Sequence, residues 1–318
     1  MIEQNISLKP YNTFGMDVAA KYFSSINSEE SLLELLSSPE AKNNPLFVLG
    51  GGSNILLTKN VDGLVIRNEM EGILDTVDIG DYYLVKVAAG MNWHQFVLYC
   101  VHQGMAGVEN LALIPGSVGA SPIQNIGAYG VELKDVFHSL EALHVSDLNK
   151  VQLSHKDCAF GYRDSIFKRS YKNQYVITSV TFKLAKKPNF KISYGAIGQE
   201  LEAMGVKELS LIAISQAVMN IRNSKLPNPD RIGNAGSFFK NPEINADIFN
   251  QIKNNYPDAP GYSVEHDLIK IPAGWLIEQC GWKGYRKGDA GCFEKQALVL
   301  VNYGNAKGDE IFTLSEDI

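Results

Sequence analysis

The sequence contains few cysteines and no paired cysteine motif. Its 318 residues include four cysteines, and none has the Cys-x-x-Cys spacing that commonly binds zinc. Four scattered cysteines are also too few for a disulfide framework. We therefore expect reduced thiols, no metal site and a core that folds without covalent or metal cross-links. The four residues are Cys100, Cys158, Cys280 and Cys292.

Positive charge is also scarce. The chain has 29 basic and 35 acidic side chains, which gives a formal net charge of −6. Nucleic-acid-binding proteins need clustered lysine and arginine to displace the counterions of the phosphate backbone. The composition therefore argues against a nucleic-acid partner, although a small basic pocket remains compatible with it.

Two further features are missing, a secretory signal and a membrane-spanning segment. The stretch Met1–Ser7 has no basic residues followed by an apolar run, so it does not resemble a signal peptide. The longest uncharged stretch, residues 110–131, contains Pro115, Pro122 and four glycines, which do not suit a membrane helix. We expect a cytoplasmic protein without a membrane partner, in which this stretch forms a system of loops.

What remains is a mixed pattern of helices and strands without a fixed-period repeat. Helical spacing occurs at 28–37 and 93–102, and strand-like runs occur at 46–49, 63–67, 82–88, 139–145, 174–184 and 297–302. The pattern predicts an α+β protein. A helical run that ends near Arg222 meets a proline-rich turn at 225–230, which predicts a domain boundary there.

A glycine-rich loop follows the strand predicted at 46–49. It contains Gly50, Gly51, Gly52, Ser53 and Asn54. Glycines allow successive backbone N–H groups to converge on an anion without obstruction by side chains. The loop lacks the lysine of a Walker motif and the GxGxxG pattern of a Rossmann fold, so an ordinary tight turn is the alternative.

A second small-residue loop spans residues 114–130 and has no charged side chain. Such a loop can cover a flat, partly apolar ring while its N–H groups bind a pyrophosphate. Two buried turns are the structural alternative. Because both loops lie in one predicted domain, they favour a single large ligand.

Six stretches in this order resemble the UDP-N-acetylenolpyruvoylglucosamine reductase family, nearly from end to end. They are Tyr11–Gly15, Val48–Asn54, Ile114–Gly119 with Gln124–Gly130, Phe160–Asp164, Gly236–Pro242 and Ala273–Ile277. The resemblance implies an α+β FAD-binding fold of the vanillyl-alcohol-oxidase/PCMH type over residues 1–222, in two α+β lobes divided near residue 67. A smaller α+β substrate-binding domain, residues 223–318, is implied after it.

The resemblance also implies a reaction, cofactors and a substrate. NADPH reduces bound FAD, and a hydride then passes to the enolpyruvyl double bond of UDP-N-acetylglucosamine-enolpyruvate, giving UDP-N-acetylmuramate for peptidoglycan. A monomer without a nucleic-acid or membrane partner is expected. Hydride addition builds negative charge that delocalises into the neighbouring carboxylate, and a proton must reach the other carbon. The site therefore needs a cation and an acid.

Two residues match the family's catalytic positions. Arg163 can bind a carboxylate with two N–H groups and stabilise enolate character, whereas without the family context a surface pair with Asp164 is as good an interpretation. Ser237 corresponds to the serine that donates the proton, and its hydroxyl needs neighbours that stabilise the alkoxide. Without that context a Gly-Ser sequence is usually a turn.

The same resemblance assigns cofactor and substrate contacts. Tyr194 matches a tyrosine that closes over substrate and Lys225 a contact to the diphosphate, although alone they would be read as a half-buried aromatic and a solvated lysine. The remaining substrate positions are Tyr129, Tyr162, Asn241 and Gln296. The cofactor positions are Gly50, Gly51, Gly52, Ser53, Asn54, Gly119, Ala120, Ser121, Gln124, Asn125, Ile126 and Gly127.

The carboxyl-terminal end departs from the family pattern. The family carries a catalytic glutamate on a strand near its end, whereas this sequence ends in a predicted helix that contains Ile311 and Leu314. Glu316 lies on the charged face of that helix, so we expect a shortened substrate domain with slow or no turnover. Another FAD-linked oxidase of this fold and a non-catalytic flavin-binding protein are therefore alternatives.

Overall fold

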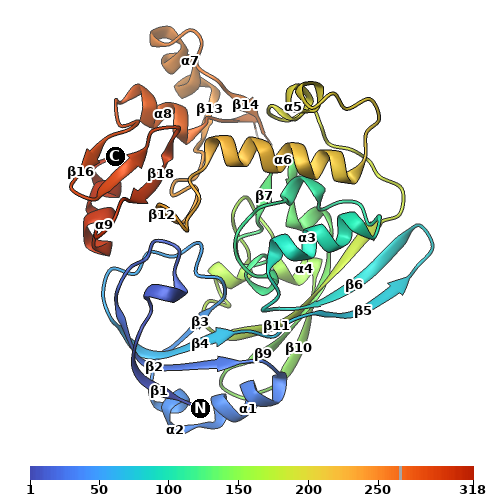
Figure 1. Cartoon of the computed structure of the whole chain (residues 1–318), viewed down its shortest axis with the longest axis vertical. Coiled ribbons are helices and arrows are strands. Elements are labelled where there is room, and N and C mark those ends of the chain that lie inside the picture. The colour runs from blue at the N-terminus through green and yellow to red at the C-terminus, as the bar shows by residue number, and fades with distance from the viewer. Residues whose placement is uncertain (265–266) are drawn as a thin grey trace. The chain divides into compact units, whose positions relative to one another are not determined.

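The computed structural model describes residues 1–264 and 267–318, and the chain divides into two compact units (Figure 1). Unit 1 consists of Met1–Tyr11, Val18–Ser53 and Asn60–Ser224, and unit 2 consists of Asn12–Asp17, Asn54–Lys59 and Lys225–Ile318. The sequence suggested two contiguous domains. Two short early segments instead belong to the second unit.

Unit 1 begins with a four-stranded sheet in the order β1-β2-β4-β3. Strands β2 and β3 both pair with β4 in parallel, and β1 is antiparallel to β2. Helices α1 and α2 connect β2 to β3, and α1 buries Leu32, Leu35 and Leu36. The bounds are β1 Glu3–Ser7, β2 Ala19–Ile26, α1 Glu29–Ser37, α2 Pro39–Asn43, β3 Leu46–Leu49 and β4 Val61–Asn68.

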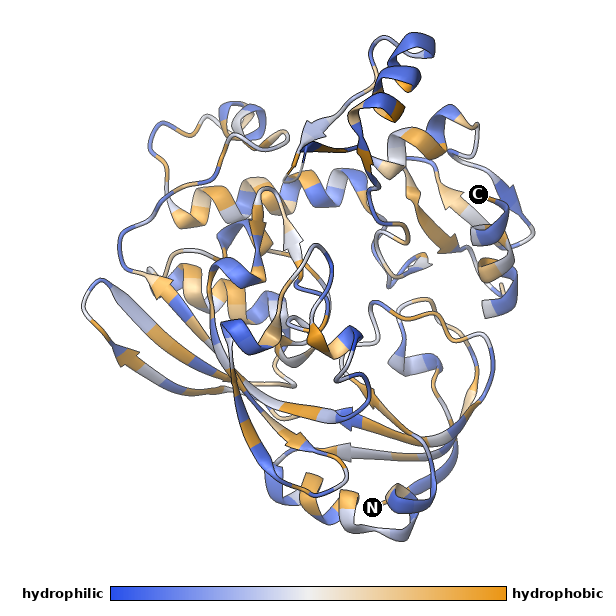
Figure 2. Ribbon diagram, turned by 180° about the vertical axis from the view of Figure 1, so that it is seen from behind, coloured by the Kyte–Doolittle hydropathy of each residue, from blue (hydrophilic) through white to orange (hydrophobic). Residues whose placement is uncertain are grey.

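A second sheet of unit 1 has five antiparallel strands in the order β10-β9-β11-β6-β5. Its central strand β11 has a nearly continuous buried run, and the ribbon coloured by hydropathy shows hydrophobic segments along these strands (Figure 2). The bounds are β5 Ile73–Asp78, β6 Tyr82–Ala88, β9 Phe137–His144, β10 Lys150–Ser154 and β11 Tyr175–Ala185.

Helix α3 packs on this second sheet through aromatic side chains. The ring centroids of Phe96 and Phe182 are 4.6 Å apart, and Trp93 meets Phe182 edge-on at 5.8 Å. Trp93 Nε1 donates to Leu111 O at 3.0 Å, so the indole is buried with its polar group satisfied. The helices of this part are α3 Trp93–His102, α4 His155–Cys158, α5 Ile197–Ala203 and α6 Leu211–Lys225.

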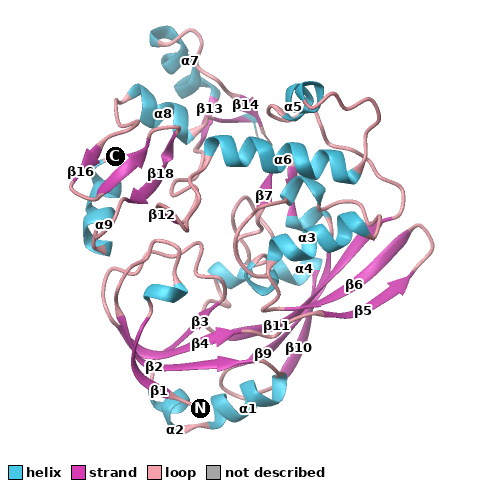
Figure 3. Ribbon diagram, viewed as in Figure 1, coloured by secondary structure: helices cyan, strands magenta, loops and turns pink. Residues whose placement is uncertain are grey.

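Most of the chain between α3 and β9 is loop (Figure 3). Within it, a hairpin is formed by β7 Gly127–Ala128 and β8 Val131–Glu132. Its two turn residues, Tyr129 and Gly130, have φ values of +50° and +78°. Positive φ at both positions is typical of a type I′ turn, whose twist matches that of paired strands.

Unit 2 contains two small sheets. The first has the order β12-β18-β17-β16, with helices α8 and α9, and the second has the order β13-β15-β14, with helix α7. The bounds are β12 Gly233–Asn234, β13 Glu243–Asn245, α7 Ala246–Asn255, β14 Tyr262–Ser263, β15 Leu268–Lys270, α8 Ala273–Gln279, β16 Arg286–Lys287, β17 Ala290–Phe293, β18 Gln296–Asn302 and α9 Gly308–Asp317.

Hydrogen bonds explain why residues 12–17 belong to unit 2. Thr13 exchanges two hydrogen bonds with Asn234, from Asn234 N to Thr13 O at 3.0 Å and from Thr13 Oγ1 to Asn234 O. Asn302 Nδ2 donates to Phe14 O at 2.9 Å. Residues 12–15 of the family-like motif Tyr11–Gly15 therefore have a structural role in unit 2.

Several expected features can be compared with the structure directly. The strand predicted at 82–88 and the helix predicted at 93–102 have those bounds, and the terminal helix is present as α9. The four cysteines are free thiols, as predicted. In the described part of the chain, no helix combines the length and apolar character needed to cross a membrane.

Candidate active site

The two glycine-rich loops lie against each other within unit 1. A Cβ atom on Gly51 would lie 2.9 Å from Gly116 Cα, and one on Gly50 would clash with the Ser117 hydroxyl. Gly52 has a φ of +61°, a left-handed conformation that glycine adopts without strain. The contact between the loops is compatible with the expectation that both belong to one site. Gly50 and Gly51 are needed for that contact, because a side chain at either position would clash with the second loop.

The second loop is fixed to the end of β6 and the start of α3. Gly119 N donates to Ala89 O at 2.7 Å, and Val118 N donates to Met91 O at 2.9 Å. A Cβ atom on Gly119 would lie 2.5 Å from Ala89 Cβ. The small residues that follow, Ala120 and Ser121, continue this tightly packed backbone; Ser121 Oγ donates to Val118 O at 2.6 Å.

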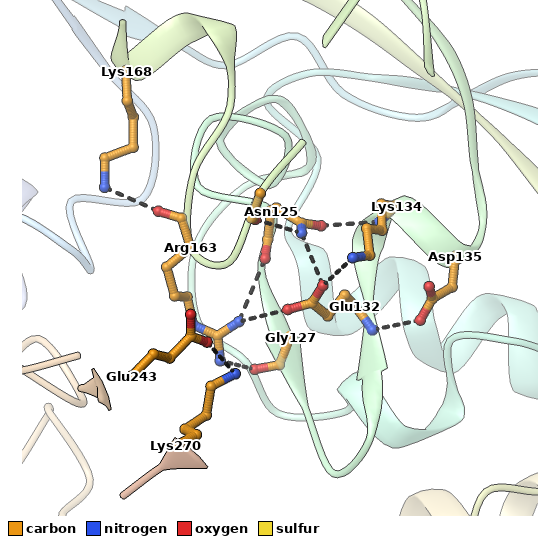
Figure 4. A network of polar contacts seen from close by, with 10 residues as sticks. Asn125, Gly127, Glu132, Lys134, Asp135, Arg163, Lys168, Glu243 and Lys270 are labelled. Carbon is orange, nitrogen blue, oxygen red and sulfur yellow. Dashed lines mark hydrogen bonds and ion pairs between the residues drawn. The ribbon is translucent and has the colours of Figure 1, made fainter. Parts of the chain in front are cut away.

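Asn125 is fully buried and its side chain is committed to the protein. Its Nδ2 donates to Gly161 O at 3.0 Å and to Glu132 Oε2 at 3.1 Å, while its Oδ1 accepts from Lys134 N at 3.0 Å (Figure 4). Asn125 also has a φ of +45°. The polar groups of the Asn125 side chain are therefore occupied by contacts within the protein.

Arg163 is directed at the hairpin that follows Asn125. Its Nη2 donates to Gly127 O, its Nη1 donates to Asn125 O at 3.4 Å, and Glu132 Oε1 lies 4.0 Å from Nη1 (Figure 4). The guanidinium carbon lies 5.4 Å from the ring centroid of Tyr162.

The alternative interpretation of Arg163 as the partner of Asp164 is wrong. Asp164 pairs with Arg169 instead. Arg163 itself has a φ of +53°, an uncommon conformation for a non-glycine residue that often occurs at functional sites.

A second arginine, which sequence reasoning missed, contacts the residue that precedes the second loop. Arg222 on α6 donates from Nε to Leu113 O at 3.2 Å, and Leu113 N donates to His94 Nδ1 at 3.0 Å. Leu113 has a φ of +59° and directly precedes the second loop. Arg222 and His94 therefore hold the start of that loop from both sides of one residue.

The charges of this cluster affect one another. Burial, and then the positive charge of Arg222, lower the pKa of His94, so its ring is kept neutral and can accept from Leu113 N. Burial raises the pKa of Tyr129, although Arg222 opposes this. Burial also lowers the pKa of the Arg222 guanidinium. Neither His94 nor Arg222 belongs to a sequence motif that would have singled it out.

Arg222 also bears on whether the site suits an anionic cofactor. Among the described residues, no carboxylate lies within ion-pair distance of its half-buried guanidinium. A half-buried cation without a carboxylate partner suits an anionic or electron-rich ligand. Together with two contacting loops of small residues, this donor set fits a dinucleotide such as FAD.

The remaining predicted residues are divided between the units. Arg163, Tyr129, Tyr162, Tyr194 and the loop residues Gly50–Ser53 and 119–127 belong to unit 1. Asn54, Lys225, Ser237, Asn241 and Gln296 belong to unit 2.

Within unit 2, Ser237 is exposed in a short turn beside β18. Gly236 N donates to Asn234 Oδ1 at 2.9 Å, and Phe238 N donates to Leu298 O at 2.9 Å, so both neighbours of Ser237 are fixed. Gly236 has a φ of +68°. The chain bends at Gly236, and Ser237 is exposed.

Asn241 and Gln296 lie outside α8, but their side chains are close to its first two residues, Ala273 and Gly274. Asn241 Oδ1 accepts from Ala273 N at 2.9 Å, which caps the helix. Gln296 Oε1 would lie 3.4 Å from a Cβ atom on Gly274. Two basic residues that follow α8 form ion pairs with carboxylates. Lys283 pairs with Glu278, and Arg286 pairs with Asp289.

Comparisons with known proteins define the class first. Residues 20–147 match a family described as an FAD binding domain, and residues 228–318 match the C-terminal domain of UDP-N-acetylenolpyruvoylglucosamine reductase. The chain is therefore a flavoprotein with the predicted FAD-binding fold followed by a reductase-type domain.

Full-length relatives identify the family. The chain is 48% identical over 317 residues to UDP-N-acetylenolpyruvoylglucosamine reductase of Amoebophilus asiaticus. The aligned region covers 100% of this chain and 94% of that protein. The reductase of Flavobacterium johnsoniae is also 48% identical, over 319 residues, with coverage of 100% and 94%. The chain belongs to the UDP-N-acetylenolpyruvoylglucosamine reductase family, which confirms the resemblance seen in the motifs.

A solved structure agrees with this assignment. The crystal structure of UDP-N-acetylenolpyruvylglucosamine reductase from Thermus caldophilus superposes with a TM-score of 0.69 at 25% sequence identity. The match covers 100% of this chain and 94% of that chain.

Proposed function

We propose that this chain catalyses the NADPH-dependent reduction of UDP-N-acetylglucosamine-enolpyruvate to UDP-N-acetylmuramate, a step of peptidoglycan precursor synthesis. The observation that carries the proposal is the position of Arg163. Its guanidinium is held by the carbonyl oxygens of Asn125 and Gly127, which belong to the proposed flavin loop. A cation that binds carboxylates is thereby fixed on the loop that would cover the flavin.

The two glycine-rich loops would hold FAD through their backbone N–H groups. When bound there, FAD would supply the hydride-transfer chemistry between NADPH and the substrate's double bond. Small residues keep the loop surface open to a flat ring, and Arg222 supplies positive charge under the loop that begins after Leu113. We propose this role for all of the predicted cofactor positions in the two loops, which are residues 50–54, 119–121 and 124–127.

Arg163 would bind the carboxylate of the enolpyruvyl group and stabilise the negative charge that develops during reduction. The carbonyl oxygens of Asn125 and Gly127 fix the guanidinium before the substrate arrives, so less ordering is needed in the transition state.

Ser237 would supply the proton to the other carbon from its Oγ atom. The hydrogen bonds of Gly236 and Phe238 hold its backbone, and the side chain is exposed and accessible to a substrate. Replacement by alanine should slow the substrate-dependent step by about 10²- to 10⁴-fold.

The nucleotide end of the substrate would be bound by Tyr194, with Lys225 at the diphosphate, and further substrate contacts would come from Tyr129, Tyr162, Asn241 and Gln296. Aromatic side chains pack on a uracil or sugar, and a lysine attracts a diphosphate as a point charge. We further propose a monomer located in the cytoplasm; light scattering of the purified protein tests the first statement and cell fractionation the second.

Absorption spectroscopy tests the function in two steps. The purified protein is expected to show a flavin spectrum that NADPH bleaches without oxygen and that UDP-N-acetylglucosamine-enolpyruvate then restores. A colourless protein that cannot take up FAD would contradict the proposal. Restoration by oxygen with an alcohol substrate, and none by the nucleotide sugar, would favour an FAD-linked oxidase instead.

A further inference from the structure

Two tyrosine-bearing segments of unit 1 contact each other beside the β7–β8 hairpin. The first is the hairpin turn at Tyr129 and Gly130, and the second is the linker of residues 186–196 between β11 and α5, which carries Tyr194. A Cβ atom on Gly130 would lie 3.2 Å from Tyr194 Cβ, and one on Gly195 would lie 3.6 Å from Tyr129 Cδ1. The two aromatic residues are therefore presented from adjoining backbones.

One buried side chain joins these two segments. Asn110 Nδ2 donates to Tyr129 O at 2.9 Å and to Lys191 O at 2.7 Å. Asn110 is 1% exposed, and its Oδ1 has no hydrogen-bond partner among the described residues. An unsatisfied buried acceptor is unfavourable, so stability alone does not account for an amide at this position. The useful feature is the pair of N–H groups, which a short side chain can offer to two carbonyl oxygens at once.

Hydrogen bonds on both sides of Asn110 hold its backbone in place. It lies in the short 3-10 helix Glu109–Leu111, whose end accepts the Trp93 indole hydrogen bond at Leu111 O. Gly107 N donates to Glu109 Oε2 at 2.6 Å at its other end. Both neighbours of Asn110 are buried. The amide is therefore a fixed point against which two more exposed segments are held.

Tyr129 also needs an external contact to keep its conformation. Its φ of +50° is costly for a residue with a side chain, and such conformations persist where surrounding contacts determine them. The hydrogen bond from Asn110 to Tyr129 O is one such contact. Tyr194 has no comparable strain, but it is 48% exposed, so its position depends on how the linker is held.

We propose that Asn110 is a positioning residue that docks the linker of residues 186–196 onto the β7–β8 hairpin, so that Tyr129 and Tyr194 meet the nucleotide part of the substrate together. In this role Asn110 does not contact the reacting atoms, and it meets the second loop at Tyr129, beyond the proposed cofactor positions, which end at Gly127. The inference rests on the proposed function for its substrate, but the docking of the linker can be tested without any ligand.

The test compares Asn110→Ala with Asn68→Ala in the full-length holoenzyme. Asn68 is a matched control because it is also buried, donates from Nδ2 to Ile177 O at 3.0 Å and lies on β4. Two measurements are made on each protein: the KM for UDP-N-acetylglucosamine-enolpyruvate, and the rate of trypsin cleavage after Lys191, an exposed residue in the middle of the linker.

For Asn110→Ala we expect the KM to rise by about 5- to 30-fold, because two hydrogen bonds that hold the two segments are lost. Cleavage after Lys191 should become several-fold faster, whereas flavin reduction by NADPH should be unchanged. Asn68→Ala should leave all three values near those of the wild type. Equal effects of the two variants would overturn the proposal, and so would a raised KM without faster cleavage, since that would indicate direct contact of Asn110 with the substrate.

A second pair of variants decides the matter if Asn110→Ala does not fold. Gly130→Ala places a methyl group against Tyr194, whereas Gly104→Ala creates a similar backbone strain, at a φ of +71°, with nothing within 4 Å. Only Gly130→Ala should raise the KM and speed cleavage after Lys191; if both glycine variants behave alike, the docking is refuted. If the wild type shows no substrate-dependent turnover, the proposed function fails, and the cleavage rates alone then support or refute the docking.

Discussion

Arg163 and Arg222 both donate to backbone carbonyl oxygens of the loop region between α3 and β9. Arg163 contacts Asn125 O and Gly127 O, and Arg222 contacts Leu113 O. A carbonyl oxygen carries only a partial charge, so these hydrogen bonds orient each guanidinium without neutralising it; the carboxylate of Glu132 lies 4.0 Å from Arg163 Nη1. At the scale of single residues, the site is thus prepared for negative charge on a ligand.

The first prediction concerns Arg163. Replacement by alanine should leave the reduction of FAD by NADPH unchanged and slow the substrate-dependent reoxidation by about 10²- to 10³-fold, because the developing carboxylate charge loses its fixed partner. Stopped-flow absorbance separates the two steps.

Arg169→Ala is the matched control for this prediction, since Arg169 lies in the same segment but pairs with Asp164. It should keep both rates. Equal slowing of both steps in Arg163→Ala would contradict the assignment and would indicate damage to the flavin site instead.

At the scale of elements, the sequence was informative where burial alternates regularly. The strand at 82–88 and the helix at 93–102 were predicted with their observed bounds, because their apolar residues follow the period of one sheet face or one helix face. Strand β2 was missed, since its run Ala19–Ile26 mixes lysine and serines with apolar residues. Tertiary pairing with β1 and β4, rather than local pattern, makes it a strand.

The contents of the site were predictable only in part, for a related reason. The two glycine-rich loops were visible in the sequence, but the contact of Gly51 with Gly116 depends on the fold. His94 and Arg222 meet the same residue, Leu113, from positions far apart in the sequence. No local spacing signals such a contact, so both were overlooked.

The second prediction tests the close approach of the loop to β6. Gly119→Ala should destabilise the protein and weaken FAD binding, because the added methyl group would lie 2.5 Å from Ala89 Cβ in a tightly packed backbone. We expect a loss of about 1–3 kcal/mol in the free energy of unfolding. Chemical denaturation, followed by flavin fluorescence and circular dichroism, measures both effects.

Gly198→Ala provides the comparison for Gly119→Ala. A Cβ atom on Gly198, in α5, would meet nothing within 4 Å, so alanine there should be neutral or slightly stabilising. A Gly119→Ala protein as stable as this control would show that the contact with Ala89 relaxes freely.

The third prediction is a dependence on pH that originates in His94. Because the folded protein lowers the pKa of His94 below its usual 6.5, the unfolded chain binds the proton more readily. This contribution to stability is complete above about pH 6.5 and is lost as the pH falls through the lowered pKa. Unfolding midpoints and FAD release between pH 8 and pH 5 measure it.

His94→Asn isolates this effect, since an amide oxygen can accept from Leu113 N without titrating in this range. Its pH profile should be flatter than that of the wild type between pH 5 and 6.5. Superimposable profiles of wild type and His94→Asn would exclude His94 as the source.

At the scale of the whole molecule, each unit combines distant parts of the chain. Residues 12–17 and 54–59 belong to unit 2, although they precede most of unit 1 in the sequence. The proposed FAD loops, in contrast, belong to unit 1, apart from Asn54. Ligand binding to the loops should therefore stabilise mainly unit 1.

The last prediction is that FAD raises the thermal stability of the cofactor-free protein in proportion to the logarithm of its concentration. A ligand that binds only the folded state adds about 2.7 kcal/mol at 100 times its Kd. For a unit of this size such a gain corresponds to a rise in Tm of roughly 5–10 °C. Differential scanning calorimetry of the stripped protein over a series of FAD concentrations measures it.

Riboflavin has the ring but no diphosphate, so it should raise the Tm much less if backbone N–H groups of the two loops bind the diphosphate. Equal shifts with riboflavin and FAD would show that the loops recognise the ring alone, and no shift with either would contradict the assignment of the loops.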